Sequence, residues 1–185
     1  MTDRRAARLK LRLRPHAPTI LLVGGGDGTE PLRRYARALA QSPRDLQILA
    51  VCGRNDALAR RISEDNHAGV HVYGFVDNMP ELMLAADLLV TRAGPGMIAE
   101  GLACGCPLLM TGYLPGQEDG NVEEVISRRL GQYVPRTAAL VAAVEQWFAK
   151  PEHERVADAE RARAAGGPGA AFQVADIMAR MVDPD

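Results

Sequence analysis

Short apolar runs alternate along the chain with stretches in which apolar residues recur every three or four positions. The first pattern is typical of buried β-strands, and the second is typical of amphipathic helices. Strands are predicted at residues 19–23, 46–52, 70–73, 88–90, 107–110 and 132–134. Helices are predicted at residues 30–41, 56–66, 78–86, 96–104, 121–130 and 137–148. Because the strands are apolar throughout, they indicate an α/β fold with a doubly wound, parallel, Rossmann-like sheet that is covered on both faces.

The first seventeen residues differ from this alternating region because they are strongly basic. Leu9, Leu11 and Leu13 occupy every second position, which predicts an extended strand and not an amphipathic helix. We interpret residues 1–17 as a basic arm or interdomain linker, either solvated or attracted to anionic lipid. Residues 18–150 then form the Rossmann-like domain, and residues 151–185 form a C-terminal helical tail.

The composition excludes several classes of protein. A net charge of −1 and an aromatic content of 4% argue against nucleic acid as a partner. The longest apolar runs are far shorter than a membrane span, and the basic start lacks the apolar stretch of a cleavable signal. Three cysteines, an odd number, suggest reduced thiols. We therefore expect a cytoplasmic protein and leave open a peripheral contact at the cytoplasmic face of the membrane.

Glycine-rich segments follow four of the predicted strands, at residues 24–28, 53, 94–96 and 112–120. The carboxyl ends of parallel strands meet at one edge of the sheet, which is where doubly wound folds bind their ligands. These segments therefore predict a single binding site. No metal is expected there, because Cys104 and Cys106 lack a second ligand pair and the four histidines are scattered.

The segment Gly94, Pro95 and Gly96 links a predicted strand to a predicted helix. A helix start presents free backbone N–H groups and the positive end of a dipole, so it can hold an anion, and proline is tolerated in its first turn. Glu100 follows one turn later. A carboxylate so close to a phosphate needs neutral donors such as ribose hydroxyls; the alternative is a surface glutamate stabilised by the helix dipole.

The glycine run at residues 24–28 is a weaker signal. Gly26 lies where the backbone could approach a phosphate, but position 29 is threonine, so the run does not match the dinucleotide fingerprint. A plain tight turn is the alternative. Arg54 follows the second strand, where NAD enzymes carry an acidic residue, and would suit either a pyrophosphate or the 2′-phosphate of NADP.

Residues 116–121 form a second polar segment after a strand. Gln117 and Glu118 have side chains that pair well with adjacent sugar hydroxyls, and Asn121 can cap the following helix. The alternative is a polar turn that ends in a helix cap. Together with the turn at 94–96, the segment predicts a ligand that is a nucleotide bearing a polyhydroxylated group.

Four segments in succession resemble one family. They are CGRN at residues 52–55, GFV at 74–76, RAGPGMIAE at 92–100 and GYLPGQEDGN at 112–121. This series is similar to that of the monogalactosyldiacylglycerol synthases, which are relatives of the peptidoglycan N-acetylglucosaminyltransferase. The resemblance covers about residues 18–150.

The resemblance implies the donor-binding half of a two-domain GT-B glycosyltransferase. Such an enzyme would use UDP-galactose or UDP-glucose, invert the anomeric centre without a metal or other cofactor, and glycosylate a lipid acceptor, here diacylglycerol. The acceptor-binding domain would carry the catalytic base. This chain matches only the donor half, so we expect it to be a truncated domain or to have a separate acceptor-binding subunit, and to turn over poorly alone.

The resemblance also implies roles for individual residues. It assigns the uracil to Phe75 and Val76, the diphosphate to Gly94, Pro95 and Gly96 with Gly26 and Arg54, the ribose to Glu100, and the sugar or its phosphate to Gln117, Glu118 and Asn121. Three alternatives stay open: a UDP-sugar epimerase-like domain, a non-catalytic UDP-sugar-binding subunit, and an NADP-dependent reductase, which would usually need a Tyr-x-x-x-Lys pair that the chain lacks.

Overall fold

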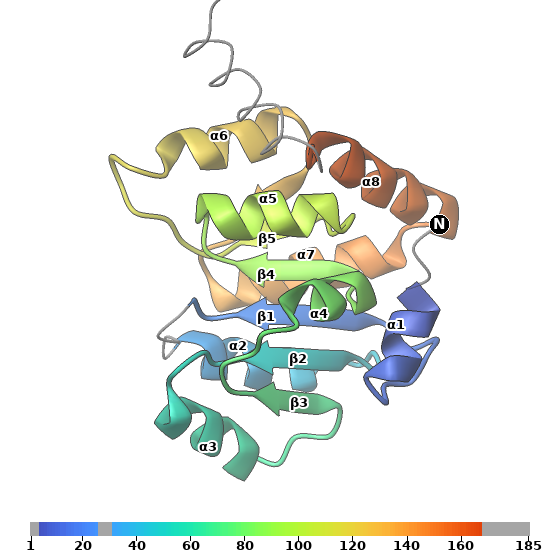
Figure 1. Ribbon diagram of the computed structural model, residues 1–185, viewed down its shortest axis with the longest axis vertical. Coiled ribbons are helices and arrows are strands. Elements are labelled where there is room, and N and C mark those ends of the chain that lie inside the picture. Colours follow the sequence, from blue (N-terminus) through green and yellow to red (C-terminus); the bar gives the residue numbers. More distant parts are fainter. Residues whose placement is uncertain (1–3, 26–30, 168–185) are drawn as a thin grey trace, which may run out of the picture.

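The computed structural model describes residues 4–25 and 31–167, which form an α/β domain (Figure 1). Its strands are β1 (Thr19–Val23), β2 (Gln47–Val51), β3 (Val70–Tyr73), β4 (Leu88–Thr91), β5 (Leu108–Met110) and β6 (Gly131–Tyr133). Its helices are α1 (Arg4–Lys10), α2 (Pro31–Ala40), α3 (Asp56–Glu64), α4 (Met79–Ala85), α5 (Pro95–Ala103), α6 (Asp119–Ser127), α7 (Thr137–Ala149) and α8 (Glu152–Ala165).

The six strands form one sheet in the order β3-β2-β1-β4-β5-β6, and every neighbouring pair is parallel. The order runs outward in both directions from β1 and β4, which makes the sheet doubly wound, as the apolar runs predict. In such a sheet the crevice for a ligand opens between the two central strands, at their carboxyl ends.

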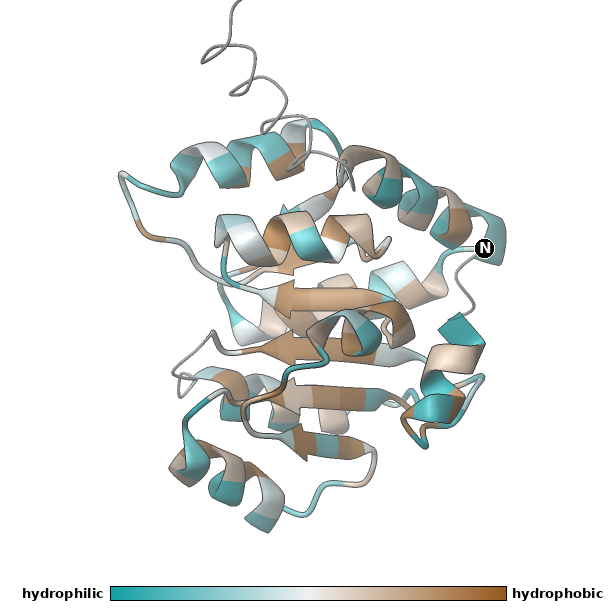
Figure 2. Ribbon diagram, in the orientation of Figure 1, coloured by the Kyte–Doolittle hydropathy of each residue, from teal (hydrophilic) through white to brown (hydrophobic). Residues whose placement is uncertain are grey.

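Each face of the sheet is covered by helices because successive side chains of a strand point to opposite faces. Ile20 and Leu22 of β1 belong to the core that the sheet shares with α2, α3 and α7, whereas Leu21 and Val23 belong to the core on the α4, α5, α6 and α8 side. Hydropathy colouring shows the apolar strands between amphipathic helices (Figure 2). In the first of these cores, the ring of Trp147 packs edge-on against Phe148, with 4.9 Å between ring centroids.

The amino-terminal segment differs from the prediction, because residues 4–10 form helix α1 and not an extended strand. The alternating leucines are a poor guide here: Leu9 is exposed, whereas Leu13 is buried in the core beside α4. Arg8 is buried too, so this residue does not belong to a solvated arm. The division of the chain at residues 17 and 150 stays a prediction.

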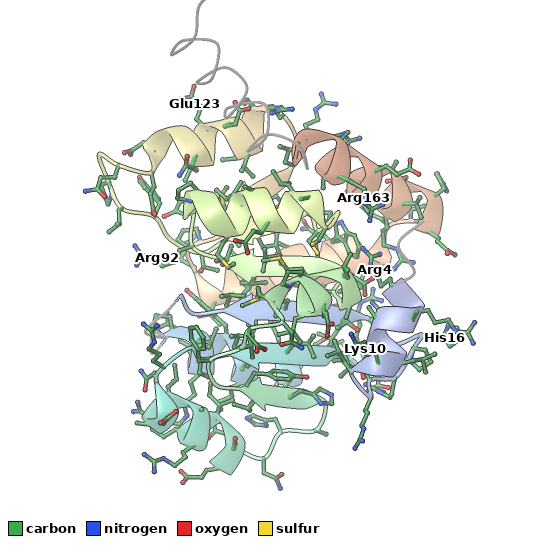
Figure 3. All side chains as sticks on the ribbon, viewed as in Figure 1. Arg4, Lys10, His16, Arg92, Glu123 and Arg163 are labelled. Carbon is green, nitrogen blue, oxygen red and sulfur yellow. The ribbon has the colours of Figure 1, made fainter. Side chains whose placement is uncertain are left out.

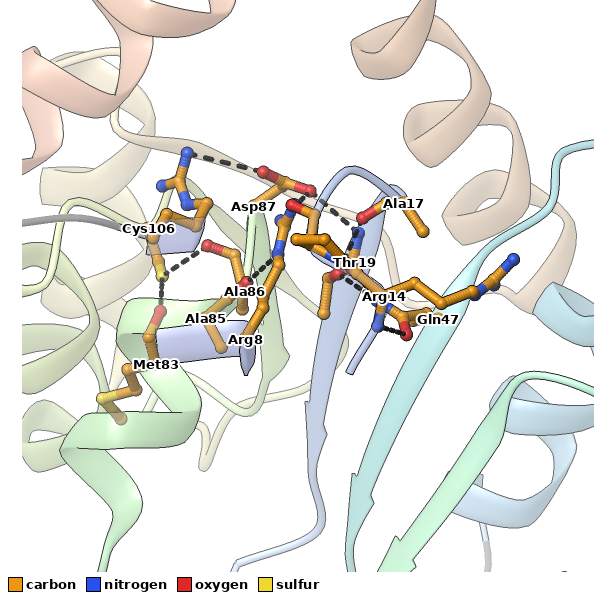
Figure 4. A network of polar contacts seen from close by, with 12 residues as sticks. Arg8, Arg14, Ala17, Thr19, Gln47, Met83, Ala85, Ala86, Asp87 and Cys106 are labelled. Atoms are coloured by element: carbon orange, nitrogen blue, oxygen red, sulfur yellow. Dashed lines mark hydrogen bonds and ion pairs between the residues drawn. The ribbon is translucent and has the colours of Figure 1, made fainter. Parts of the chain in front are cut away.

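Asp87, just before β4, holds α1 in place by pairing with it and with β1 (Figure 4). Its Oδ2 accepts hydrogen bonds from Nη2 of Arg8 at 2.7 Å and from the backbone N–H of Thr19 at 2.8 Å. Arg8 also donates through Nε to the carbonyl of Ala85 at 2.8 Å, and Arg4 lies 3.4 Å from Oδ1. This network closes the amino-terminal edge of the sheet, opposite the edge with the glycine-rich loops.

Replacing Asp87→Ala should lower the free energy of unfolding by about 3 kcal/mol, because it leaves the guanidinium of Arg8 buried without its counter-charge. Urea unfolding followed by circular dichroism measures this change. Asp45→Ala is the matched control, since Asp45 pairs with Arg14 but is 80% exposed, and it should change stability far less. Equal effects of the two substitutions would show that the Asp87 network does not stabilise the fold.

Candidate functional site

The segments that follow β1, β2, β4 and β5 lie along one edge of the sheet, where the strand arrows end (Figure 1). At Gly25 and Gly53 the backbone has positive φ values of 79° and 59°, which glycine adopts without strain. A pocket of about 270 Å³ opens between the ends of β1 and β4, with Gly24 on one side and Arg92 and Tyr113 on the other. The predicted site therefore lies at the switch point of the sheet.

Helix α5 begins at this edge and offers unpaired backbone donors. Gly94 is its N-cap residue and Pro95 its first helical residue, and the first carbonyl bond runs from the N–H of Ile98 to Gly94 at 3.1 Å. The backbone N–H groups of Gly96 and Met97 have no acceptor within residues 4–25 and 31–167. Gly96 is exposed, and a methyl group there would meet no atom within 4 Å. This turn can accept an anion, as the sequence predicts.

The segment at residues 112–121 is attached to the same turn. The backbone N–H of Ala93 donates to the carbonyl of Gly112 at 2.8 Å, and the side-chain amide of Asn121 donates to the carbonyl of Ala93 at 2.9 Å. Asn121 does not cap α6, since that helix already begins at Asp119. The structure thus brings the segment predicted to hold a sugar beside the turn predicted to hold phosphate, and Asn121 is the side chain that joins them.

The remaining polar residues of these two segments differ in how they are held. Glu118 accepts a hydrogen bond from the backbone N–H of Leu114 at 2.7 Å, so the loop fixes its carboxylate. Gln117 and Glu100 are exposed, and neither side chain has a partner in the described part of the chain. Glu100 lies on α5, five residues after Pro95, or about 7.5 Å along the helix axis. Both side chains are available to a ligand.

The residues predicted to contact the uracil follow β3, the outermost strand on this side of the sheet, and Arg54 follows β2 beside it. Phe75 is 65% exposed, Val76 is half-buried, and the guanidinium of Arg54 lies over the Phe75 ring at 5.0 Å. Arg54 is therefore paired with Phe75, the residue predicted to contact the uracil. In the sheet, β1 lies between β2, which Arg54 follows, and β4, which leads to the α5 turn. The predicted role of Gly26 concerns a residue outside the described ranges.

Arg92 is a site residue to which the sequence pattern assigned no role. It lies at the end of β4, directly before the turn, and its side chain is at the edge of the sheet where the loops gather (Figure 3). Arg92 is exposed, and it makes no ion pair with any residue that the structure describes. A cation two residues before the N-cap Gly94 was the signal that could have identified it, because a cation and a helix start both attract an anion.

Two of the three cysteines are buried. Burial raises the pKa of Cys52 to about 11 and that of Cys106 to about 12, so both thiols are protonated at neutral pH. Cys104 is only half-buried. In the described ranges no three His, Cys, Asp or Glu side chains are grouped so that they could hold a metal ion. None of the helices described is both long and apolar enough to cross a membrane.

The fold and the candidate site together define a doubly wound α/β domain whose glycine-rich segments gather at the carboxyl ends of β1, β4 and β5. Residues 19–181 match the glycosyltransferase family 28 C-terminal domain, and the chain belongs to this family. The chain is 36% identical to the chloroplastic monogalactosyldiacylglycerol synthase of Spinacia oleracea over 95% of its own length. It spans only 35% of that relative's length.

Solved structures share the fold. The MurG structure from Acinetobacter baumannii superposes with a TM-score of 0.71 at 21% identity, covering 89% of this chain and 52% of that one. The Anabaena Alr3699/HepE structure, solved in complex with UDP-glucose, superposes with a TM-score of 0.69 at 18% identity, covering 96% and 52%. The Rossmann-like sheet is thus the fold of one half of a GT-B glycosyltransferase.

Replacing Asn121→Ala should lower the free energy of unfolding by about 1 kcal/mol, because the buried carbonyl of Ala93 loses its donor. Gln117→Ala removes a polar side chain of the same loop that has no partner in the described chain, and it should change stability by less than about 0.5 kcal/mol. Chemical denaturation of both variants tests whether Asn121 joins the loop to α5. A larger loss with Gln117→Ala would refute that role.

Proposed function

We propose that this chain binds the UDP-sugar donor of a glycosyltransferase whose acceptor is a lipid. One observation carries the proposal: the free N–H groups at the start of α5, the cation of Arg92 and the polar loop at residues 112–121 meet around a single turn. A diphosphate fits the first two features, and a hexose fits the third.

In the proposed complex, the diphosphate lies on the turn Gly94, Pro95 and Gly96, with Arg92 as its cation. Glu100 accepts hydrogen bonds from the ribose hydroxyls, one helical turn away. The uracil lies toward Phe75 and Val76, where the Arg54 guanidinium would have to share the ring face or move aside. Gln117 and Glu118 face the hexose.

The chemistry of the leaving group explains how such a site could act without a metal ion. Displacing UDP from the anomeric carbon builds negative charge on the β-phosphate oxygen. A helix start that is aimed at this oxygen stabilises the charge without having to reorganise during the reaction. We propose a direct, inverting displacement in which an acceptor-binding domain or a separate subunit supplies the general base.

The relatives support the choice of substrates. The spinach relative is named as a monogalactosyldiacylglycerol synthase, which favours diacylglycerol as the acceptor and UDP-galactose or UDP-glucose as the donor. The complex of the Anabaena protein with UDP-glucose supports a UDP-hexose donor. We place the protein in the cytoplasm, at the membrane face where such a lipid would be reached.

Titration calorimetry of the chain with UDP, UDP-galactose, UDP-glucose and NADPH tests the proposal. We expect binding of UDP and at least one UDP-hexose, no binding of NADPH, and affinities that EDTA leaves unchanged. Lack of UDP binding, tighter NADPH binding or a requirement for a metal would each overturn part of the proposal.

Replacing Glu100→Gln should weaken the binding of UDP about tenfold, because hydrogen bonds from the ribose to a charged acceptor are lost. Glu123→Gln is the matched control: Glu123 is exposed and lies on α6, away from the ends of the strands (Figure 3). Calorimetry on both variants measures the effect, and equal affinities would remove Glu100 from the ribose site.

A further inference from the structure

Glu118 places a carboxylate against the turn that starts α5. A methyl group added to Gly94 would lie 3.8 Å from Oε1 of Glu118, and no other non-neighbouring heavy atom would lie within 4 Å of it. Glu118 is only partly exposed, although residues 114–117 and 119–120 on either side of it are exposed. The carboxylate therefore lies beside the helix start to which the proposed function assigns a diphosphate.

Hydrogen bonds within the loop hold the Glu118 carboxylate in this position. Oε2 of Glu118 accepts a hydrogen bond from the backbone N–H of Leu114 at 2.7 Å. The backbone N–H of Glu118 in turn donates to the carbonyl of Leu114 at 2.9 Å. Three residues further on, Asn121 ties the start of α6 to Ala93. One hydrogen bond thus holds the carboxylate itself, and Asn121 holds the start of its helix against the residue before Gly94.

The neighbouring acidic side chain is engaged elsewhere. The carboxylate of Asp119 accepts a hydrogen bond from the backbone N–H of Gly116, within the loop itself. Within the described part of this loop, Glu118 is therefore the negative charge that lies against the turn. Arg92 is a positive charge at the pocket between the ends of β1 and β4.

A carboxylate in this position affects two ligands differently. The terminal phosphate of UDP carries up to two negative charges and brings no donor, so Glu118 repels it. In a UDP-hexose the same phosphate is esterified and carries one charge, and the sugar hydroxyls beside it donate hydrogen bonds that a carboxylate accepts. The carboxylate thus opposes the product and favours the donor.

We propose that Glu118 sets the preference of this site for UDP-hexose over UDP, so that the spent nucleotide leaves after transfer. This inference rests on the proposed function and adds to it a means of distinguishing the donor from the product. Glu118 is a specificity-determining residue in this role, and it takes no part in the displacement itself.

Titration of the Glu118→Gln chain with UDP and with the UDP-hexose that binds the unsubstituted chain tests the inference. The amide can still accept from the N–H of Leu114, so the loop should keep its shape, which an unchanged melting temperature would verify. We expect the Kd for UDP to fall about fivefold to tenfold and the Kd for UDP-hexose to rise, because repulsion and a charged acceptor are both lost.

Glu123→Gln is the control for the loss of one negative charge, and it should leave both Kd values and their ratio unchanged.

A second measurement is the ionic strength series: added salt should reduce the preference for UDP-hexose in the unsubstituted chain and not in Glu118→Gln. If the two affinities change by the same factor in Glu118→Gln, the inference fails while the proposed function stands. If the unsubstituted chain binds neither ligand, both fail.

Discussion

The parallel pairing of β1 with β4 is the constraint on which the arrangement of this protein depends. These two strands are central in the sheet, and the chain leaves them in opposite directions, toward β2 and β3 on one side and toward β5 and β6 on the other. Their loops must therefore separate and leave a crevice at the carboxyl ends. The α5 turn, the pocket beside Arg92 and the loop at residues 112–121 all lie at this crevice.

The two edges of the sheet are built for different purposes. At the amino-terminal edge, Arg8 and Asp87 are buried and paired, and the backbone of Thr19 uses the same carboxylate. At the carboxyl-terminal edge, donors and charges are left unpaired in the described chain: the N–H groups of Gly96 and Met97, and the side chain of Arg92. Unsatisfied groups are costly when buried, so they are kept where solvent or a ligand can reach them.

The sequence predicts those parts of the molecule that depend on local pattern. Continuous apolar runs predict β1, β2, β4 and β5 because strands buried on both faces need no alternation. The edge strands β3 and β6 are less buried and carry polar residues, but they too lie where the sequence predicts strands. Pro95 between two glycines predicts the start of α5, since proline at the first helical position costs no hydrogen bond. The gathering of the glycine-rich segments at one edge follows from the parallel sheet alone.

What the sequence could not predict depends on partners far away in the chain. Helix α1 was missed because Arg8 is buried against Asp87, 79 positions later, and a window of local pattern does not reach that far. Asn121 was interpreted as a helix cap because its partner, the carbonyl of Ala93, is 28 positions earlier. The stacking of Arg54 on Phe75 likewise joins two strand ends, and it gives the arginine a neighbour that charge alone does not suggest.

The packing of Trp147 has a practical consequence. It is the chain's single tryptophan and lies on α7, in the core between this helix and the sheet. With Leu88 and Pro107 it lines a cleft at the starts of β4 and β5, away from the loops that gather at the other edge of the sheet. Its intrinsic fluorescence therefore reports whether that core is intact and is insulated from ligand occupancy. Emission spectra can therefore follow the unfolding of this domain while candidate ligands are added.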